Sequence, residues 1–166
     1  QQFLYVWLKC DEPAVGKLVK QIRANDIDNS GDDSIELLMA SDQAKAQYYR
    51  VCINSAGAIY DAKVDPQSVG AKDDSRWDSQ ANAKVKVGKR DWEVRLRLPI
   101  ARIGLGLDTK RTTLLRLNVI RNRWASRPVQ SAWSSASSSR ASERFGIVNL
   151  NRPKDNGRLI WSCDFE

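Results

Sequence analysis

The chain has 166 residues, of which 42% are hydrophobic, and it carries a formal net charge of +7. This length suits one domain with a sizeable core, and no apolar run approaches the roughly 20 residues that cross a bilayer, so we expect no membrane insertion. The sequence contains no histidine, which excludes a Ser-His-Asp or Cys-His nucleophile and a histidine-ligated haem, and we expect no haem cofactor.

Short segments in which apolar and polar residues alternate follow one another along the chain. The clearest, Trp92 to Leu98, places apolar side chains on one face and charged side chains on the other, as in an antiparallel strand with one side on a core. Such segments predict strands at 3–9, 17–24, 34–40, 47–54, 57–63, 81–87, 91–98, 113–122, 144–150 and 158–164. The predicted fold class is therefore all-β: an antiparallel β-sandwich, jelly-roll or immunoglobulin-like, with roughly ten strands and one short helical turn.

Turn residues separate these segments. Residues 54–57 (NSAG) predict a hairpin in which the glycine adopts a positive φ, and residues 88–91 (GKRD) predict another. Residues 99–104 (PIARIG) predict the helical turn, which glycine ends. Two polar stretches, 64–80 and 124–143, resist strand assignment and are expected to form functional or mobile loops.

Tryptophan and cysteine residues mark the expected core. Trp7 and Trp92 lie on apolar faces of predicted strands, and both are expected to be buried. Cys10 and Cys52 also lie in strand-like segments, which predicts buried free thiols. Cys163 is the third cysteine, and three cannot all pair within one chain; one disulfide, as in an exported protein, is the alternative.

The positive charge is concentrated in the second half of the chain. Its cationic residues there are Arg102, Lys110, Arg111, Arg116, Arg121, Arg123, Arg127, Arg140, Arg144, Arg152, Lys154 and Arg158. A basic face attracts polymers that carry carboxylate or sulfate groups, and a solvated surface is the simpler alternative. No nucleic-acid-binding motif accompanies the charge, so we expect no nucleic-acid partner.

A series of short motifs occurs in a distinctive order over residues 4–150. The motifs are LYV at 4–6, DDSIEL at 32–37, YYRVCIN at 48–54, GAIYD at 57–61, WEV at 92–94, LPI at 98–100, LNVIR at 117–121, AWS at 132–134 and FG at 145–146. In this order they resemble the family 9 carbohydrate-binding modules and their bacterial relatives. The resemblance implies an antiparallel β-sandwich that binds sugars, often with calcium, beside secreted polysaccharide-degrading enzymes.

The resemblance also implies a function and a setting. We expect a non-catalytic domain that binds a polysaccharide or oligosaccharide and targets a larger secreted, periplasmic or cell-surface protein to glycans, with other domains of that parent as partners. The acidic or sulfated glycans favoured by the basic second half are candidate ligands. The chain is expected to be one domain, 1–166, that lacks the family's first strands or is excised from a larger protein.

One departure from the family supports an alternative function. The positions of the two tryptophans that clamp the terminal sugar in well-understood members hold Ser30 and Ser139 here, and Cys52 replaces a sugar-contacting arginine. The glutamate of the second motif is retained as Glu36. The alternative is therefore a structural or interaction domain of an extracellular multidomain protein that has lost sugar binding.

Candidate sugar-contacting residues are aromatic, arginine or acidic, because sugar C–H faces stack on flat rings and charged groups bond hydroxyls. The predicted set is Glu36, Arg50, Trp77, Arg121, Arg123, Trp124, Arg127 and Trp133. The planar fork of arginine also matches carboxylate and sulfate. The alternatives are ion pairs for Glu36, Arg50 and Arg121, and packing against the sandwich for the tryptophans.

A cluster of acidic residues precedes the second predicted core strand. Residues 26–31 (DIDNSG) begin like an EF-hand loop, but the twelfth position is Leu37 rather than glutamate. The family resemblance nevertheless implies a structural calcium ion, with ligands predicted as Asp11, Asp26, Asp28 and Asp33. The alternative is a polar turn closed by side-chain hydrogen bonds.

Overall fold

The computed structural model describes residues 2–41, 46–69, 73–106, 113–134 and 140–150. Within these ranges the protein consists of two antiparallel sheets joined by turns and short 3-10 helices. The strands are β1 (Phe3–Asp11), β2 (Ser34–Ser41), β3 (Tyr48–Asn54), β4 (Ile59–Val64), β5 (Asp73–Asp74), β6 (Asn82–Val87), β7 (Asp91–Pro99), β8 (Leu114–Arg123), β9 (Val129–Ala132) and β10 (Gly146–Asn149). The 3-10 helices are η1 (Val15–Lys17), η2 (Ile100–Ile103) and η4 (Ser142–Arg144).

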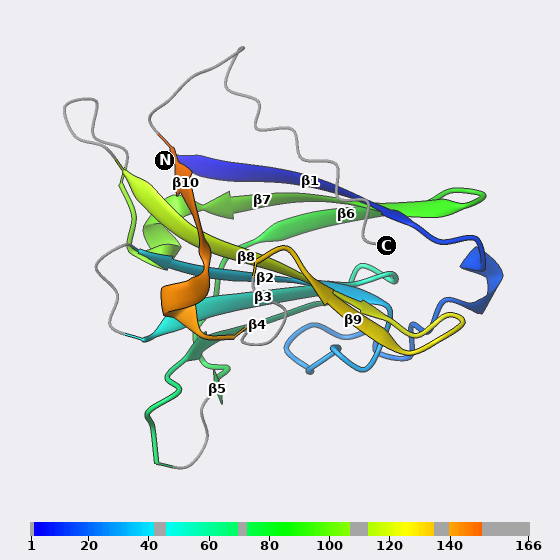
Figure 1. The fold of residues 1–166 in the computed structure, drawn as a ribbon, viewed down its shortest axis with the longest axis horizontal. Helices are drawn as coiled ribbons and strands as arrows, with labels where there is room; N and C mark the ends of the chain where they lie inside the picture. Colours follow the sequence, from blue (N-terminus) through cyan, green and yellow to red (C-terminus); the bar gives the residue numbers. More distant parts are fainter. Residues whose placement is uncertain (1, 42–45, 70–72, 107–112, 135–139, 151–166) are drawn as a thin grey trace.

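The two sheets differ in size. The smaller has the strand order β1-β7-β6, and the larger has the order β10-β8-β2-β3-β4-β5. Strand β9 pairs with residues 120–123 of β8, while β10 pairs with residues 114–117 of the same strand. Figure 1 shows β1, β7 and β6 side by side, with β8, β2, β3 and β4 forming the second layer. The predicted antiparallel β-sandwich is confirmed.

The main core lies between the sheets and follows from the alternation of side chains. Ile35, Leu37 and Met39 of β2 are fully buried there, together with Trp92 and Leu98 of β7. Burying a large apolar side chain is worth about 1.5–3 kcal/mol, so this layer supplies much of the driving force for folding. The remaining residues of β2 point to the opposite face of the larger sheet, away from this core.

The predicted strands agree with the observed ones at eight positions, with ends that differ by at most two residues. The hairpin glycine Gly57 has φ 91° and Gly104, which ends η2, has φ 70°, both as predicted. The short strands β5 and β9 lie within the stretches predicted as loops. The predicted strand 158–164 lies outside the described residues. No helix in the described ranges has the length and apolar character needed to span a membrane.

The prediction of a strand at 17–24 is wrong. This segment holds the end of η1 and an irregular loop. Its backbone amides bond to two neighbouring carboxylates: Val19 donates to Asp33 at 2.7 Å, and Gln21 and Ile22 donate to Asp32 at 2.9 Å. These carboxylates accept the amide hydrogen bonds that the carbonyl groups of a neighbouring strand would otherwise accept. The backbone of this segment is therefore satisfied without joining a sheet.

The prediction that Trp7 is buried is also wrong. In β1 the side chains of Leu8 and Cys10 point into the core, so Trp7 faces solvent and is 51% exposed. Trp92 is fully buried, as predicted. Cys10 and Cys52 are buried free thiols, also as predicted, while Cys163 lies outside the described residues.

Candidate functional site

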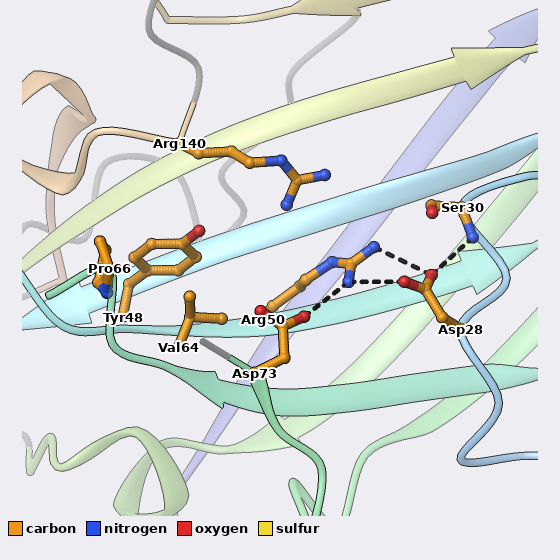
Figure 2. Close-up of a pocket in the computed structure, with 8 residues that line it drawn as sticks. All are labelled: Asp28, Ser30, Tyr48, Arg50, Val64, Pro66, Asp73 and Arg140. Atoms are coloured by element: carbon orange, nitrogen blue, oxygen red, sulfur yellow. Dashed lines mark hydrogen bonds and ion pairs between the residues drawn. The ribbon is translucent and has the colours of Figure 1, made fainter. Parts of the chain in front are cut away.

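A pocket of about 380 Å³ opens on the face of the larger sheet that points away from the core. Its lining residues come from β3, β4, β5, the loop before β2 and the segment before η4; they are Asp28, Ser30, Tyr48, Arg50, Val64, Pro66, Asp73 and Arg140. Figure 2 shows the guanidinium group of Arg50 at the centre, with Asp28 on one side and the ring of Tyr48 on the other. Charged and apolar groups therefore share one concave surface.

Arg50 is the centre of an ion-pair network. Its Nε donates to Glu36 Oε2 at 2.7 Å, and its Nη1 donates to Asp73 Oδ2 at 3.0 Å. Both Nη atoms also donate to Asp28, at 3.2 and 3.1 Å (Figure 2). The guanidinium lies 5.0 Å from the ring centroid of Tyr60. Burial opposes the charge on Arg50, but Glu36 and Asp28 outweigh it and place the pKa of Arg50 above its usual value.

Glu36 forms the floor beneath this arginine and is fully buried. It faces Cys52 and Ile120 across the neighbouring strands, so the register of β2 fixes its place at the middle of the sheet. Besides Arg50, it accepts hydrogen bonds from Arg140 Nη2, at 3.0 and 2.8 Å, and from Asn122 Nδ2 at 2.8 Å. A buried carboxylate with this many donors is fully compensated and rigid.

Tyr48 and Asp73 line the rest of the pocket, and Tyr60 contacts Asp73 and Arg50 beside it. Tyr60 donates its hydroxyl hydrogen bond to Asp73 at 3.3 Å, and burial followed by the charge of Asp73 raises the pKa of Tyr60 to about 12. Burial likewise raises the pKa of Tyr48. Asp28 behaves in the opposite way: burial is the largest single influence and acts to raise its pKa, but the hydrogen bonds from Arg50 and Ser30 and the charge of Arg50 together lower it. At neutral pH the tyrosines remain neutral and Asp28 remains ionised.

The charges of the pocket and its floor nearly cancel. Two guanidinium groups face three carboxylates: Arg50, Arg140, Glu36, Asp28 and Asp73. The parts that reach solvent are the side chains of Asp28, 49% exposed, Arg140, 42% exposed, and Asp73, 34% exposed. Such an arrangement offers acceptors and donors side by side, which suits hydroxyl groups because a hydroxyl both donates and accepts.

Of the eight predicted sugar-contacting residues, two belong to this pocket. Arg50 lines it and Glu36 lies beneath it. The sequence reasoning missed Tyr48, Asp73 and Arg140. Tyr48 could have been predicted, because it lies two residues before Arg50 in the same strand and therefore on the same face of the sheet.

The predicted tryptophans lie elsewhere. Trp77 packs against the main core, with its ring 4.7 Å from that of Tyr49 and its Nε1 donating to the carbonyl of Arg102. Trp133 also packs against this core, and its ring covers Gly146 so closely that an added Cβ there would lie 2.4 Å from it. Neither lines the pocket.

Trp124 lies beside the pocket rather than in it. It is 42% exposed, and its Nε1 donates to the carbonyl of Ser30, a residue of the pocket wall, at 3.2 Å. Its backbone amide donates to Asp33 at 2.9 Å, which holds it at the end of β8. An exposed aromatic ring therefore lies next to the position where the clamp tryptophan of the resembled family is replaced by serine.

The predicted arginines of β8 serve a structural contact. Arg123 donates to Glu12 at 2.6 and 3.1 Å, and Arg121 donates to the carbonyl of Asp11 at 2.6 Å and to Glu12 at 3.4 Å. These bonds link the end of β1 to β8, and Arg123 is the main reason why the pKa of Glu12 lies below its usual value. Arg127 is exposed between β8 and β9.

Two of the four predicted calcium ligands, Asp28 and Asp33, already bond to other groups of the protein. Asp33 accepts from the amides of Val19, Trp124 and Ala125, and Asp28 is paired with Arg50. Among the described residues no three histidine, cysteine, aspartate or glutamate side chains gather in a way that could hold a metal ion. Calcium binding by the protein stays a prediction, which a titration followed by calorimetry would test.

Comparison with known proteins finds solved structures of similar fold. No protein-family model matches the sequence, and no curated protein matches it. A protein from Bacteroides uniformis, provisionally described as carbohydrate-binding, has a TM-score of 0.60 at 12% identity, over 89% of this chain and 71% of that one.

A family 9 carbohydrate-binding module from Caldicellulosiruptor kristjanssonii is similar in two structures. Both have a TM-score of 0.58 at 15% identity; the glucose complex covers 93% of this chain and 73% of the module, and the cellotriose complex covers 97% and 75%. The present chain therefore has a fold like that of the family 9 carbohydrate-binding modules, as its motif order predicted.

Proposed function

We propose that this protein is a non-catalytic carbohydrate-binding domain whose pocket around Arg50 binds a sugar residue. The observation that carries the proposal is the concave site itself, in which a buried Glu36–Arg50–Arg140 network presents polar groups to solvent. Support also comes from the similar module that was solved with glucose and with cellotriose.

The chemistry of the pocket suits a sugar ring. Asp28, Asp73 and Arg140 supply acceptors and donors for hydroxyl groups. Tyr48, Val64 and Pro66 supply an apolar wall for the C–H face of the ring. Trp124, beside Ser30, extends this surface for a second ring, so a short oligosaccharide is a better fit than a single sugar.

Neutral sugars suit this pocket better than acidic or sulfated ones. Its three carboxylates outnumber its two arginines, and both arginines already bond to Glu36. A ligand carboxylate would therefore meet Asp28 and Asp73 without an uncommitted cation. The preference for acidic or sulfated glycans that the basic second half of the chain predicts needs a different surface.

The state of the carboxylates supports a binding role rather than hydrolysis. Glycoside hydrolysis needs one protonated carboxyl group and one free carboxylate on opposite sides of the glycosidic bond. Glu36 is bonded to two arginines, and the pKa of Asp28 is lowered rather than raised. Targeting of a larger secreted protein to glycans, as an accessory to its enzyme, is part of the same proposal.

The test is calorimetric titration of the native protein and matched variants with neutral oligosaccharides chosen from a glycan array. Asp73→Asn and Arg140→Gln should each weaken binding by about 10-fold or more, since hydrogen bonds to charged groups contribute about 1.5–3 kcal/mol. The controls Asp74→Asn, the neighbouring residue of β5, and Arg144→Gln, in η4 next to Arg140, should bind as the native protein does.

Two results would count against the proposal. If the pocket variants bind as tightly as the native protein, the sugar lies elsewhere. If no glycan binds, with or without calcium, the protein fits the alternative of a structural or interaction domain, for which the serine at position 30 in place of the clamp tryptophan is the supporting observation.

A further inference from the structure

The outer face of the smaller sheet carries a row of aromatic side chains. Residues i, i+2 and i+4 of a strand share a face, and in β1 these are Phe3, Tyr5 and Trp7. Tyr5 is 69% exposed and Trp7 is 51% exposed, while their neighbours Leu4 and Val6 pack against the core. Single exposed apolar residues are ordinary, but a contiguous aromatic row on a flat sheet indicates a contact surface.

Cationic residues of the adjacent strands complete this surface. Tyr5 lies opposite Arg97 of β7, which lies opposite Asn82 of β6. Trp7 lies opposite Arg95, which in turn lies opposite Lys84. The two cross-strand rows therefore each begin with an aromatic ring, continue with an arginine and end with a polar or basic group.

The arginines lie over the aromatic rings rather than away from them. The guanidinium carbon of Arg97 is 4.8 Å from the ring centroid of Phe3, and that of Arg95 is 5.5 Å from Trp7. Beside them is a shallow cavity of about 320 Å³; its lining residues are Tyr5, Asn82, Lys84, Arg95, Leu96 and Arg97. Cation–π contact holds the planar donors of both arginines at the surface, ready for an anion.

The two rows bear three positive charges, on Arg95, Arg97 and Lys84, and no negative charge. Glu93, in the next row, is the nearby carboxylate; it lies 3.6 Å from Arg95 and accepts from Trp7 Nε1 at 3.2 Å. A contact of this length at an exposed arginine is weak, so the positive potential of the surface persists. The surface thus attracts a ligand that is apolar on one side and anionic at its edge.

We propose that this face, defined by Phe3, Tyr5, Trp7, Arg95, Arg97 and Lys84, is a second binding surface that takes the chain of a polyuronate, a polysaccharide with one carboxylate on each ring. Aromatic side chains two residues apart in a strand start about 7 Å apart, so one short stretch of a polysaccharide chain can reach both Tyr5 and Trp7. Tyr5 is paired with one arginine and Trp7 with another, which matches a ligand bearing one carboxylate for each stacked ring.

This surface differs from the pocket in position and in charge. It lies on the outside of the smaller sheet, whereas the pocket opens on the outside of the larger one. Densely sulfated glycans fit it less well, because bulky sulfate groups hold rings away from the aromatic side chains. The proposal stands whether or not the pocket binds a neutral sugar.

The test is affinity electrophoresis of the full chain through gels that contain polygalacturonate, hydroxyethyl cellulose or chondroitin sulfate, at low and physiological salt. Arg95→Gln/Arg97→Gln and Tyr5→Ala/Trp7→Ala should each weaken polygalacturonate binding by about 10-fold or more, and salt should weaken the binding of the native protein. The charge-matched control Lys17→Gln/Arg127→Gln, at two exposed positions on other segments, should lose less than about 3-fold. The pocket variant Asp73→Asn should bind polygalacturonate normally.

Each other outcome decides against the proposal. No retardation in polygalacturonate overturns it, as does an equal loss in the charge-matched control, which would show nonspecific attraction by net charge. Equal or tighter binding to hydroxyethyl cellulose or to chondroitin sulfate through the same residues overturns the assignment to a polyuronate. A concentration-dependent dimer that Tyr5→Ala/Trp7→Ala dissociates, seen by sedimentation, would assign the surface to a second copy of the chain instead.

Discussion

The two outward faces of this sandwich differ in whether their charged groups are buried or exposed. On the larger sheet, Glu36 and Arg50 are buried and bonded to each other, and only the edges of their network reach solvent. On the smaller sheet, Arg95 and Arg97 are exposed and lie over the aromatic rings of Trp7 and Phe3. Charged groups on the first face are therefore part of the fold, whereas those on the second are free to serve a ligand.

This difference indicates how mutants can separate structural roles of charged residues from functional ones. Removing one partner of a buried ion pair leaves the other charge without compensation, so loss of binding there is mixed with loss of stability. Exposed charges and rings have water as an alternative partner. Substitutions on the smaller sheet should thus change binding with only a small loss of stability, and the following experiments measure that contrast.

The largest expected effect is that of Glu36→Ala. It leaves Arg50 and Arg140 without their buried acceptor and should lower the free energy of unfolding by about 3–5 kcal/mol. Urea denaturation measures this loss. The matched change on the other sheet, Glu93→Ala, should lower it by less than about 1 kcal/mol, because its ion pair with Arg95 is exposed and long. Equal losses would contradict the contrast between the two faces.

An intermediate effect is expected for Trp7→Ala. Its side chain is half exposed and contacts Arg95 and Glu93, so the loss of stability should be limited to about 0.5–1 kcal/mol, the value of an exposed cation–π contact. Trp92→Ala in the core should cost about 3–5 kcal/mol in the same denaturation experiment. A loss at Trp7 comparable to that at Trp92 would mean that the aromatic row is structural.

The smallest effects concern pH, and they act at opposite ends of the scale. Asp28 has a lowered pKa in the folded protein, so its pairing with Arg50 stabilises the fold above about pH 3.9 and is lost as the pH falls further. On the smaller sheet, a hydrogen bond and the charge of Asp91 raise the pKa of Lys9, so that pair stabilises the fold below about pH 10.4 and is lost as the pH rises.

Denaturation midpoints across the pH range separate these two contributions. Asp28→Asn should flatten the fall in stability at the acid end, and Asp91→Asn should flatten the fall at the alkaline end. If the stability of Asp28→Asn falls at acid pH as steeply as that of the native protein, the acid dependence does not come from the pairing of Asp28 with Arg50.

The β-sandwich could be predicted from the sequence because the alternation of apolar and polar residues is a local property of each strand. Trp92 to Leu98 alternates cleanly, and the structure buries its apolar side. Trp7 was misplaced because Phe3 to Leu8 is apolar on both faces, so alternation could not decide which side is inward. Tertiary pairing with β7 settles which side of β1 is inward, because the residues opposite Tyr5 and Trp7 are arginines.

Long-range contacts explain why the site was only partly predictable. Glu36 was predicted from its position in the family motif, and Arg50 as an arginine within a predicted strand; the pairing of β2 with β3 then places both on one face. Arg140 binds Glu36 across 104 residues of sequence, and no local pattern specifies that approach. The partners of the loop aspartates were equally hard to predict. A cluster of aspartates looks the same in the sequence whether its carboxylates bind a cation or accept hydrogen bonds from backbone amides.

The attachment of the loop between β1 and β2 has a consequence for how the pocket can change. Asp32 and Asp33 hold the course of this loop mainly through bonds to its backbone amides. Figure 1 shows the loop at one end of the sandwich, beside the β8–β9 hairpin. Backbone bonding leaves the exposed residues Arg23, Ala24 and Ile27 free to vary in identity, so this loop is a natural place to diversify or graft new ligand preferences while the scaffold stays intact.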